Sequence, residues 1–355
     1  MCDFSKTGAI PEYWRGYLNE KIGKIKELQN KSASFSFGLI TDIHWCENEK
    51  LSAALMEAII SECGMRYFFN GGDLISGKGI VNEEELYDEI DGFLRTFAGI
   101  EKNCLSVEGN HERAYSTFEP PLYYVQNMKK AVLRERYFKP YTKYDDRKFS
   151  KDGSYFYADD ENNKIRYIAL NSQDVPNDDE TEEGFAVFNT LRNYGFLQDQ
   201  IDWLASEALF VPDPSWSVVV CSHAATPSLE SNKDFNYNYD IVLGLLDAFK
   251  NKRAYVGEEK HDNPIYDVSV SADFSGKGGD VIAWVGGHRH DDYIKNMLGI
   301  TIVETTTDAS YENSKKLGFK GTTDEHAFDI FTVDKEKRVV NITRIGRGFD
   351  REFVY

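Results

Sequence analysis

The chain has 355 residues, of which 41% are hydrophobic, and its formal net charge is -18, which disfavours non-specific binding to nucleic acid because such binding draws on Lys and Arg. No apolar run approaches the ~20 residues that span a bilayer, and the five cysteines are scattered without CxxC spacing, which argues against a disulfide framework. We therefore expect a soluble, cytoplasmic protein that has no membrane association and carries neither a signal peptide nor disulfides.

The first predicted element is an amphipathic helix over residues 11–30. Pro11 suits a first helical turn, and four apolar residues follow at helical spacing, namely Trp14, Leu18, Ile22 and Ile25. The polar face mixes both charge signs instead of forming the basic face of a membrane-bound helix. We expect residues 1–34 to pack this helix on the body of a domain formed by residues 35–355.

Strands and helices then alternate. Strands are expected over residues 35–41, 65–69 and 104–107, with helices over 49–63 and 83–97 between them. Gly64 is a typical left-handed terminator for the first of these helices, and Asn82 is placed to cap the second. This order predicts βαβ units, whose ligands bind beyond the carboxyl ends of the strands.

Polar side chains follow each of these strands at the point where it ends. Asp42 and His44 follow the first strand, Asp73 the second, and Asn110 and His111 the third. Because the carboxyl ends of parallel strands meet at one edge of a sheet, we expect these groups to lie close together.

Two later apolar strands also end in histidines. Residues 218–221 lead to His223, and residues 281–285 lead to Gly286-Gly287-His288-Arg289-His290. Residues two apart in extended backbone point the same way, so we expect His288 and His290 to converge on one spot. Such a pair is typical of metal ligands when the chain supplies others.

In this order, the motifs D-x-H, G-D, G-N-H-E, a lone His and G-H-x-H resemble those of the calcineurin-like metallophosphoesterase family. The resemblance covers roughly residues 36–345. It implies a single α/β domain, a two-sheet β-sandwich flanked by helices in four layers (α/β/β/α). Pattern alone supports only a mixed α/β fold with parallel units.

The resemblance also implies two metal ions that share Asp73. Asp42, His44 and His290 would complete the ligands of one ion, and Asn110, His223 and His288 those of the other. Carboxylate, amide and imidazole ligands suit Mn²⁺, Fe, Zn²⁺ or Ni²⁺. Two ions about 3.5–4 Å apart can bridge a hydroxide and clamp the attacking and leaving oxygens of a displacement at phosphorus.

The resemblance assigns His111 to the substrate side, as a general acid or a charge partner for the leaving oxygen. Asn110 would position it, and Glu112 would supply a carboxylate that orients it. The alternative is a core histidine satisfied by Glu112.

Arg289 should point away from the ligand histidines on either side of it. It either binds a substrate phosphate or forms an ion pair with Asp291 or Asp292.

The interval over about 226–280 joins two ligand loops, so we expect this insertion to shape the substrate pocket. It contains aromatic residues at 235–239, which could stack on a base or pack on the body, and a helix near 241–249. Three later strands over residues 299–305, 327–333 and 339–345 should extend a second sheet.

We predict a metal-dependent phosphohydrolase acting on a small, nucleotide-like phosphomonoester or phosphodiester. A DNA or RNA nuclease could use the same ligands, but it would need a basic groove for the strand, and the scattered Lys and Arg argue against one. A metal-stabilised binding module without turnover is the other alternative. The presence of every ligand and of His111 disfavours it.

Overall fold

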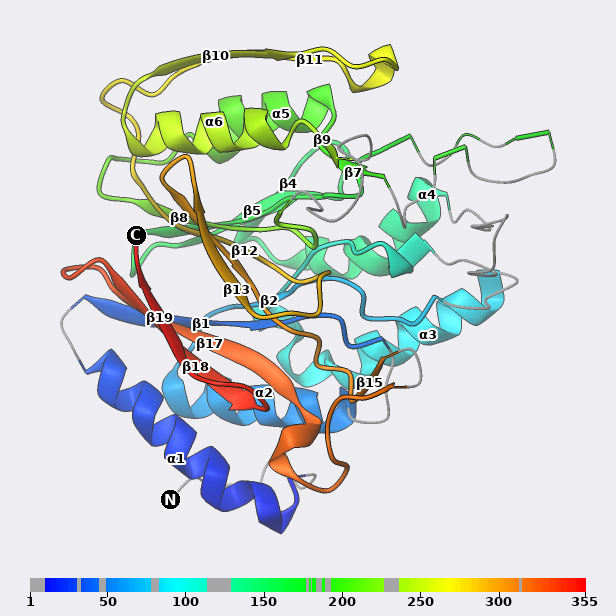
Figure 1. Ribbon diagram of the computed structural model, residues 1–355, viewed down its shortest axis with the longest axis vertical. Helices are drawn as coiled ribbons and strands as arrows, with labels where there is room; N and C mark the ends of the chain where they lie inside the picture. Colours follow the sequence, from blue (N-terminus) through cyan, green and yellow to red (C-terminus); the bar gives the residue numbers. More distant parts are fainter. Residues whose placement is uncertain are drawn as a thin grey trace.

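The computed structural model describes residues 10–30, 33–44, 49–77, 83–113, 129–176, 179, 181–182, 187–188, 193–226, 236–312 and 315–355. Two large sheets lie between helices, with α1 and α2 below them and α5 and α6 above them in Figure 1. Three buried apolar clusters fill the spaces between these layers. One lies between the lower helices and the first sheet, one between the two sheets, and one between the second sheet and the upper helices. The predicted four-layer sandwich is confirmed.

The first sheet has six strands in the order β19-β18-β17-β1-β2-β3. Their bounds are β1 Ser34–Ile40, β2 Phe68–Asn70, β3 Cys104–Ser106, β17 Ala327–Asp334, β18 Val339–Gly346 and β19 Arg351–Val354. β1, β2 and β3 are parallel, as the βαβ pattern predicts, whereas β17 to β19 are antiparallel. The carboxyl ends of β1, β2 and β3 therefore lie at the same edge of the first sheet.

The second sheet has seven strands in the order β13-β14-β12-β8-β6-β5-β4. Their bounds are β4 Arg147–Phe149, β5 Phe156–Asp160, β6 Ile165–Ala169, β8 Ser217–Cys221, β12 Asp280–Gly286, β13 Tyr293–Met297 and β14 Ile300–Glu304. β6, β8, β12 and β14 are parallel. β8 and β12 carry the later histidines at their carboxyl ends.

The expectation that all three late strands extend a second sheet is wrong in part. β14 does lie in the second sheet, but β17 and β18 complete the first, because β17 pairs with β1 along its length. Phe37 of β1 stacks on its partner Phe331 with ring centroids 4.8 Å apart. Both strands are buried on both faces, so their apolar pattern does not reveal which sheet they join.

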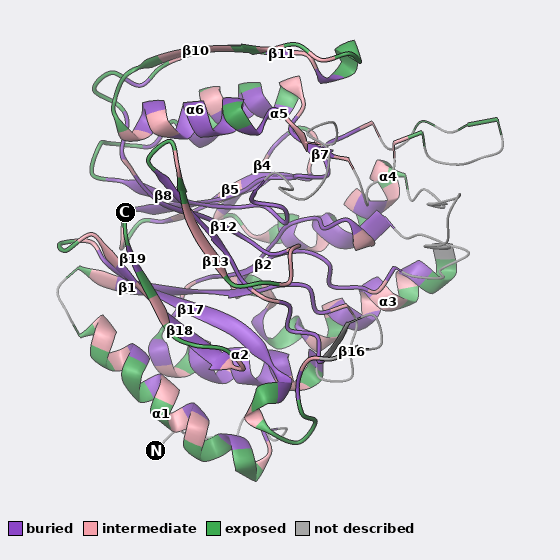
Figure 2. Ribbon diagram, viewed as in Figure 1, coloured by how far each residue is buried: buried purple, intermediate pink, exposed green. Residues whose placement is uncertain are grey.

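The helices cover the outer faces of the sheets. Their bounds are α1 Glu12–Gln29, α2 Glu49–Cys63, α3 Glu83–Thr96, α4 Lys130–Leu133, α5 Gln198–Trp203 and α6 Tyr239–Lys250. α1 begins directly after Pro11 and buries Trp14, Leu18, Ile22 and Ile25 against the first sheet and α2. Figure 2 shows the buried sheets between helices whose outer faces are exposed. No helix among the described residues is long and apolar enough to cross a membrane.

Shorter elements complete the described chain. The two-stranded sheets join β7 Tyr194–Gly195 to β9 Asn236–Tyr237, β10 Ala254–Glu259 to β11 Val268–Asp273, and β15 Tyr311–Glu312 to β16 Lys315–Lys316. The 3-10 turns are η2 Ala98–Asn103, η3 His111–Arg113, η5 Lys139–Lys143, η8 Pro264–Tyr266 and η9 Thr323–Glu325, and the π turns are η4 Arg134–Phe138 and η6 Leu204–Ala208. Asn82, predicted to cap α3, lies outside the described residues.

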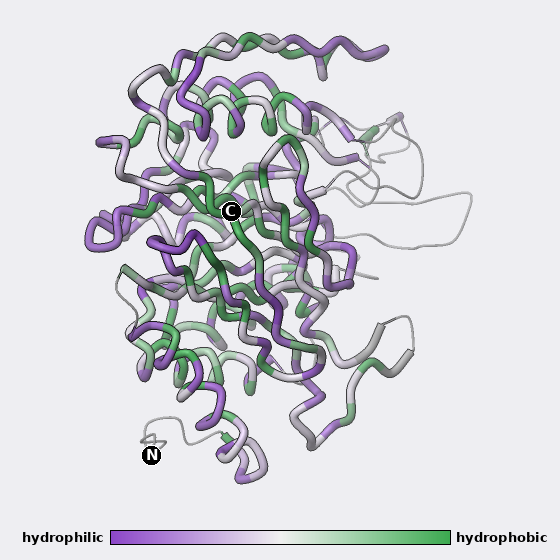
Figure 3. Tube along the Cα trace, turned by 60° about the vertical axis from the view of Figure 1, so that its left-hand side comes forward, coloured by the Kyte–Doolittle hydropathy of each residue, from purple (hydrophilic) through white to green (hydrophobic). Residues whose placement is uncertain are grey.

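The described part of the insertion, Thr226 and residues 236–280, contains β9, α6, η8 and the β10–β11 hairpin, which lies over α6 in Figure 1. Its aromatic residues pack within the protein. Tyr237 stacks on Tyr266 at 3.5 Å, and Tyr239 stacks on Trp284 at 5.9 Å between ring centroids. Figure 3 shows hydrophobic strands inside and hydrophilic segments at the periphery, whereas the outer hairpin alternates between hydrophobic and hydrophilic residues. Phe235 lies outside the described residues.

Candidate metal centre

Five strand ends deliver the predicted ligands to one place between the two sheets. Asp42 and His44 follow β1, Asp73 follows β2, Asn110 follows β3, His223 follows β8, and His288 and His290 follow β12. The structure brings all of them together, as the contacts below show. Both sheets are needed to complete the site.

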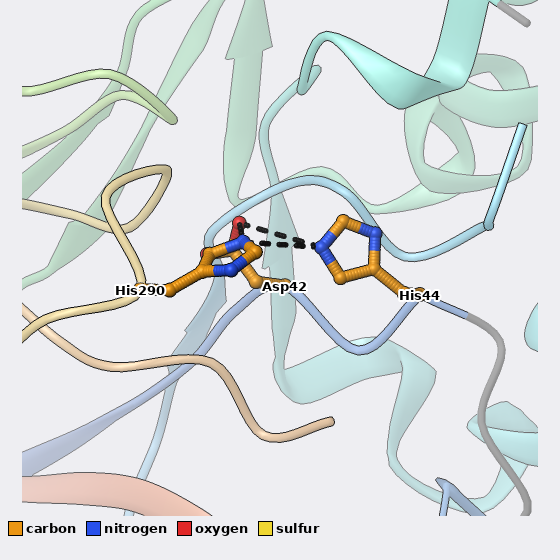
Figure 4. A group of neighbouring side chains, drawn as sticks. All are labelled: Asp42, His44 and His290. Atoms are coloured by element: carbon orange, nitrogen blue, oxygen red, sulfur yellow. Dashed lines mark hydrogen bonds and ion pairs between the residues drawn. The ribbon is translucent and has the colours of Figure 1, made fainter. Parts of the chain in front are cut away.

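The first cluster consists of Asp42, His44 and His290 (Figure 4). His290 Nε2 lies 3.0 Å from Asp42 Oδ1 and 3.2 Å from His44 Nε2, and His44 Nε2 lies 3.9 Å from Asp42 Oδ1. Burial lowers the pKa of His44 to about 3, with a further contribution from His111, so this imidazole is neutral. Two imidazole nitrogens and a carboxylate oxygen directed at one point fit a metal ion.

The second cluster is built around Asn110. Its Oδ1 lies 3.0 Å from His223 Nε2 and 3.0 Å from His288 Nδ1. His223 Nε2 is also 3.2 Å from Asp73 Oδ2. Asp73 shares one group of possible ligands with His44 and His111 and another with Asp42 and His223, so its carboxylate lies close to members of both clusters.

The charges around His223 favour a cation. Burial opposes a positive charge on this imidazole, yet Asp73 and Asp42 raise its pKa to about 10. The pKa of Asp73 is correspondingly lowered: burial raises it, but His223 and His111 outweigh that effect. The buried carboxylates of Asp73 and Asp42 thus stabilise a positive charge on His223, and a bound metal ion would supply the same charge.

Backbone carbonyls orient two of the histidines. His223 Nδ1 lies 2.8 Å from the carbonyl oxygen of Gly71, and His111 Nδ1 lies 2.5 Å from that of Ser76. In each ring Nδ1–H donates to the carbonyl, which directs Nε2 into the site. His111 Nε2 lies 3.7 Å from Asp73 Oδ2, and the His111 ring is 4.5 Å from the His44 ring.

The backbone of these loops adopts the left-handed region at residues that are not glycine. The φ values are 54° at Asp42, 51° at His44, 53° at Asp73, 72° at His288 and 57° at His290. Such conformations are costly and persist where the surroundings hold them. Here Asp42 N–H donates to the Gly72 carbonyl and His44 N–H to the Asp73 carbonyl, each at 3.0 Å.

The expectation of extended backbone at His288 and His290 is therefore wrong. The left-handed turn sends the two rings to different clusters, His288 towards Asn110 and His290 towards Asp42. This separation matches the division of ligands that the sequence resemblance implies.

The family model of calcineurin-like phosphoesterases matches residues 35–292, a segment that contains every one of these ligands. The chain belongs to the calcineurin-like phosphoesterase family. No curated protein matches the sequence.

The chain is also similar, at low identity, to several solved structures. A predicted phosphoesterase from Streptococcus pneumoniae is 9% identical, with 92% of this chain and 100% of that chain covered and a TM-score of 0.31. GAP50, the anchor in the inner membrane complex of Plasmodium, is 12% identical, with 90% and 89% covered and a TM-score of 0.44. Phosphopantetheinyl hydrolase from Mycobacterium tuberculosis is 12% identical, with 78% and 91% covered and a TM-score of 0.32.

Within the candidate site, Glu112 does not have the predicted role of orienting His111. Its Oε2 accepts the backbone N–H groups of Asp73 at 2.9 Å and Gly109 at 2.5 Å, and its Oε1 accepts that of Leu74 at 2.7 Å. Glu112 thus fixes the loop that carries Asp73. The carbonyl of Ser76 orients His111 instead.

Arg289 also has a different partner from those predicted. Its Nε lies 3.5 Å from Oε2 of Glu304, at the end of β14, and its side chain is 23% exposed. Asp292 is held by two arginines from the C-terminal strands, Arg344 and Arg351. The turn after His290 directs Asp292 to these cations, away from Arg289.

Sequence reasoning missed the threonines that brace the ligand loops. Thr41 Oγ1 donates to Asp42 Oδ2, Thr306 Oγ1 to the His290 carbonyl, and Thr307 Oγ1 to the Asp42 carbonyl, each at 2.6 Å. The run Thr305-Thr306-Thr307 directly after β14 was a usable signal, because polar residues at the carboxyl end of a parallel strand belong to the same edge as the ligands.

Proposed function

We propose that this protein is a metal-dependent phosphoester hydrolase that binds two ions, with Asp73 shared between them. Asp42, His44 and His290 would hold one ion, and Asn110, His223 and His288 the other. The convergence of these donor atoms on both sides of Asp73 is the observation that carries the proposal. The donor set suits Mn, Fe, Zn or Ni. When bound, such ions lower the pKa of water and neutralise charge on a phosphoryl group.

The chain's own groups supply orientation and a proton. The carbonyls of Gly71 and Ser76 hold His223 and His111 in place. To act as a proton donor, His111 would keep Nδ1–H on the Ser76 carbonyl and carry a second proton on Nε2, which faces the site. As the bond from phosphorus to the leaving oxygen breaks, this proton would pass to that oxygen. Arg289, held through Nε by Glu304, is the proposed contact for a substrate phosphate.

We propose that residues 35–355 act as one domain and that the insertion at about 226–280 shapes the substrate pocket. The pairing of β7 with β9 supports this proposal, because it ties the insertion to Tyr194, whose ring lies 4.7 Å from that of His288. The substrate is proposed to be a small, nucleotide-like phosphorylated molecule. The net charge of -18 disfavours the nuclease alternative.

The test is hydrolysis of an activated phosphodiester, bis(4-nitrophenyl) phosphate, beside the matching monoester, 4-nitrophenyl phosphate, by the full chain with added Mn²⁺. We expect turnover that a chelator abolishes and that fresh Mn²⁺ restores. Faster diester cleavage would direct the search to nucleotide diesters, and faster monoester cleavage to nucleotide or sugar phosphates. Failure to hydrolyse either ester, with bound metal confirmed by elemental analysis, would reject the hydrolase and favour the binding module.

A further inference from the structure

Helix α3 reaches the proposed catalytic histidine through one carboxylate. Glu89 Oε2 accepts the backbone N–H of Ser76 at 3.1 Å and that of Gly77 at 3.4 Å. The carbonyl oxygen of Ser76 lies 2.5 Å from His111 Nδ1. Glu89 and His111 therefore bind the same short segment.

The two contacts act on opposite sides of one peptide unit. The Ser76 carbonyl and the Gly77 N–H belong to the same planar group, and in a trans peptide they point in opposite directions. When Glu89 attracts the N–H, the carbonyl is turned towards His111. A carboxylate at the N–H also strengthens the carbonyl as an acceptor, because linked hydrogen bonds polarise one another.

This segment needs an anchor. It follows Asp73, whose φ of 53° is left-handed, and it includes Gly77 with a φ of 60°, so the chain turns twice within five residues. Glu112 fixes the start of the segment at the Asp73 and Leu74 amides, whereas Glu89 fixes its end. Between them the Ser76 carbonyl is held where His111 Nδ1 can donate to it.

We propose that Glu89 is a positioning residue for His111: through the Ser76–Gly77 peptide it holds the imidazole so that Nε2 faces the leaving-group oxygen. This inference rests on the proposed role of His111 as a proton donor. Glu89 itself touches neither substrate nor metal in this scheme. Removal of Glu89 should therefore slow esters whose leaving oxygen must be protonated more than esters whose leaving oxygen departs without a proton.

The experiment measures kcat and bound metal for the metal-loaded full chain and four variants, His111→Ala, Glu89→Ala, Glu89→Gln and the control Asp88→Ala. Asp88 is an exposed carboxylate on the same helix. Substrates are matched phosphoesters with leaving groups from 4-nitrophenolate, which departs without a proton, to an alkoxide, which needs one. General acid catalysis typically contributes about 10²–10⁴-fold to a rate.

We expect His111→Ala to slow the alkyl ester by at least about 10²-fold and the 4-nitrophenyl ester far less. Glu89→Ala should show the same selectivity with a smaller loss, roughly tenfold on the alkyl ester. Glu89→Gln should retain most of the rate, because its amide oxygen still accepts the two N–H groups. Asp88→Ala should match the unmodified protein.

The outcomes distinguish the role of His111 from the role of Glu89. Equal slowing of both esters by His111→Ala would reject the role of His111 itself. If His111→Ala slows the alkyl ester selectively, its own role stands. If Glu89→Ala then slows both esters equally, or slows neither, only the role of Glu89 is overturned. If Glu89→Ala loses metal or unfolds, Glu89→Asp serves instead, since it keeps the charge but withdraws it by about 1.5 Å. Unchanged selectivity in Glu89→Asp would also overturn the inference.

Discussion

At the scale of single residues, Asp73 is the group on which most of the site depends. Its Oδ1 accepts the backbone N–H of His111 at 2.8 Å, and its Oδ2 lies 3.2 Å from His223 Nε2. The strand-end motifs and their resemblance to the calcineurin-like family together predicted this carboxylate and the other proposed ligands. The partners of Glu112 and Arg289 could not be predicted, because they depend on left-handed turns that an alternating pattern does not reveal.

Asp73→Asn is expected to lower the amount of bound metal and to reduce turnover by at least about 10²-fold, since it removes a buried charge while keeping the size of the side chain. Elemental analysis and the diester assay check this outcome. Asp88→Asn is the matched control on an exposed carboxylate. Full metal content and full activity in Asp73→Asn would contradict the proposal that Asp73 is shared between two ions.

At the scale of elements, the site depends on how closely the strand ends approach one another. A Cβ atom built on Gly109, after β3, would collide with the backbone nitrogen and Oδ1 of Asp73, after β2. The parallel strands β1 to β3 were predictable from their apolar runs and the helices between them. The assignment of β17 to the first sheet was not, because a strand buried on both faces fits either sheet.

Gly109→Ala should destabilise the fold by about 1–3 kcal/mol and release metal, because the loops must separate to admit the methyl group. Gly23→Ala is the contrasting change: at this exposed position in α1 the added carbon meets no atom within 4 Å apart from its chain neighbours and the adjacent helix backbone, and alanine should stabilise the helix by up to about 1 kcal/mol. Urea unfolding and metal content measure both effects. If Gly109→Ala and Gly23→Ala had the same effect on unfolding and on metal content, the close approach of Gly109 to Asp73 would be contradicted.

At the scale of the whole molecule, the proposed ions would join the two sheets. Asp42, His44, Asp73 and Asn110 follow strands of the first sheet, whereas His223, His288 and His290 follow strands of the second. Arg344 adds a direct link, because it binds Asp329 of β17 at 2.8 Å and also holds Asp292 beyond β12. Both connections cross between the sheets.

Removal of metal should therefore lower the melting temperature of the entire domain, since a ligand that binds only the folded state stabilises it by mass action. Calorimetry with and without chelator measures the shift, and added Mn²⁺ should reverse it. Asp73→Asn should melt at the same temperature under both conditions. A chelator effect of full size in that variant would show that the stabilising ion binds elsewhere.

The pairing of β1 with β17 has a consequence for biosynthesis. β1 leaves the ribosome well before its antiparallel neighbour, which lies almost three hundred residues later, so the nascent chain must hold an open strand edge while the residues between them are translated. The segment matched by the family model ends at residue 292, before β17, and could not close that edge. We expect ribosome-bound chains that stop there to need chaperone protection, and the 355-residue chain to bind the proposed ions only after β17 has docked.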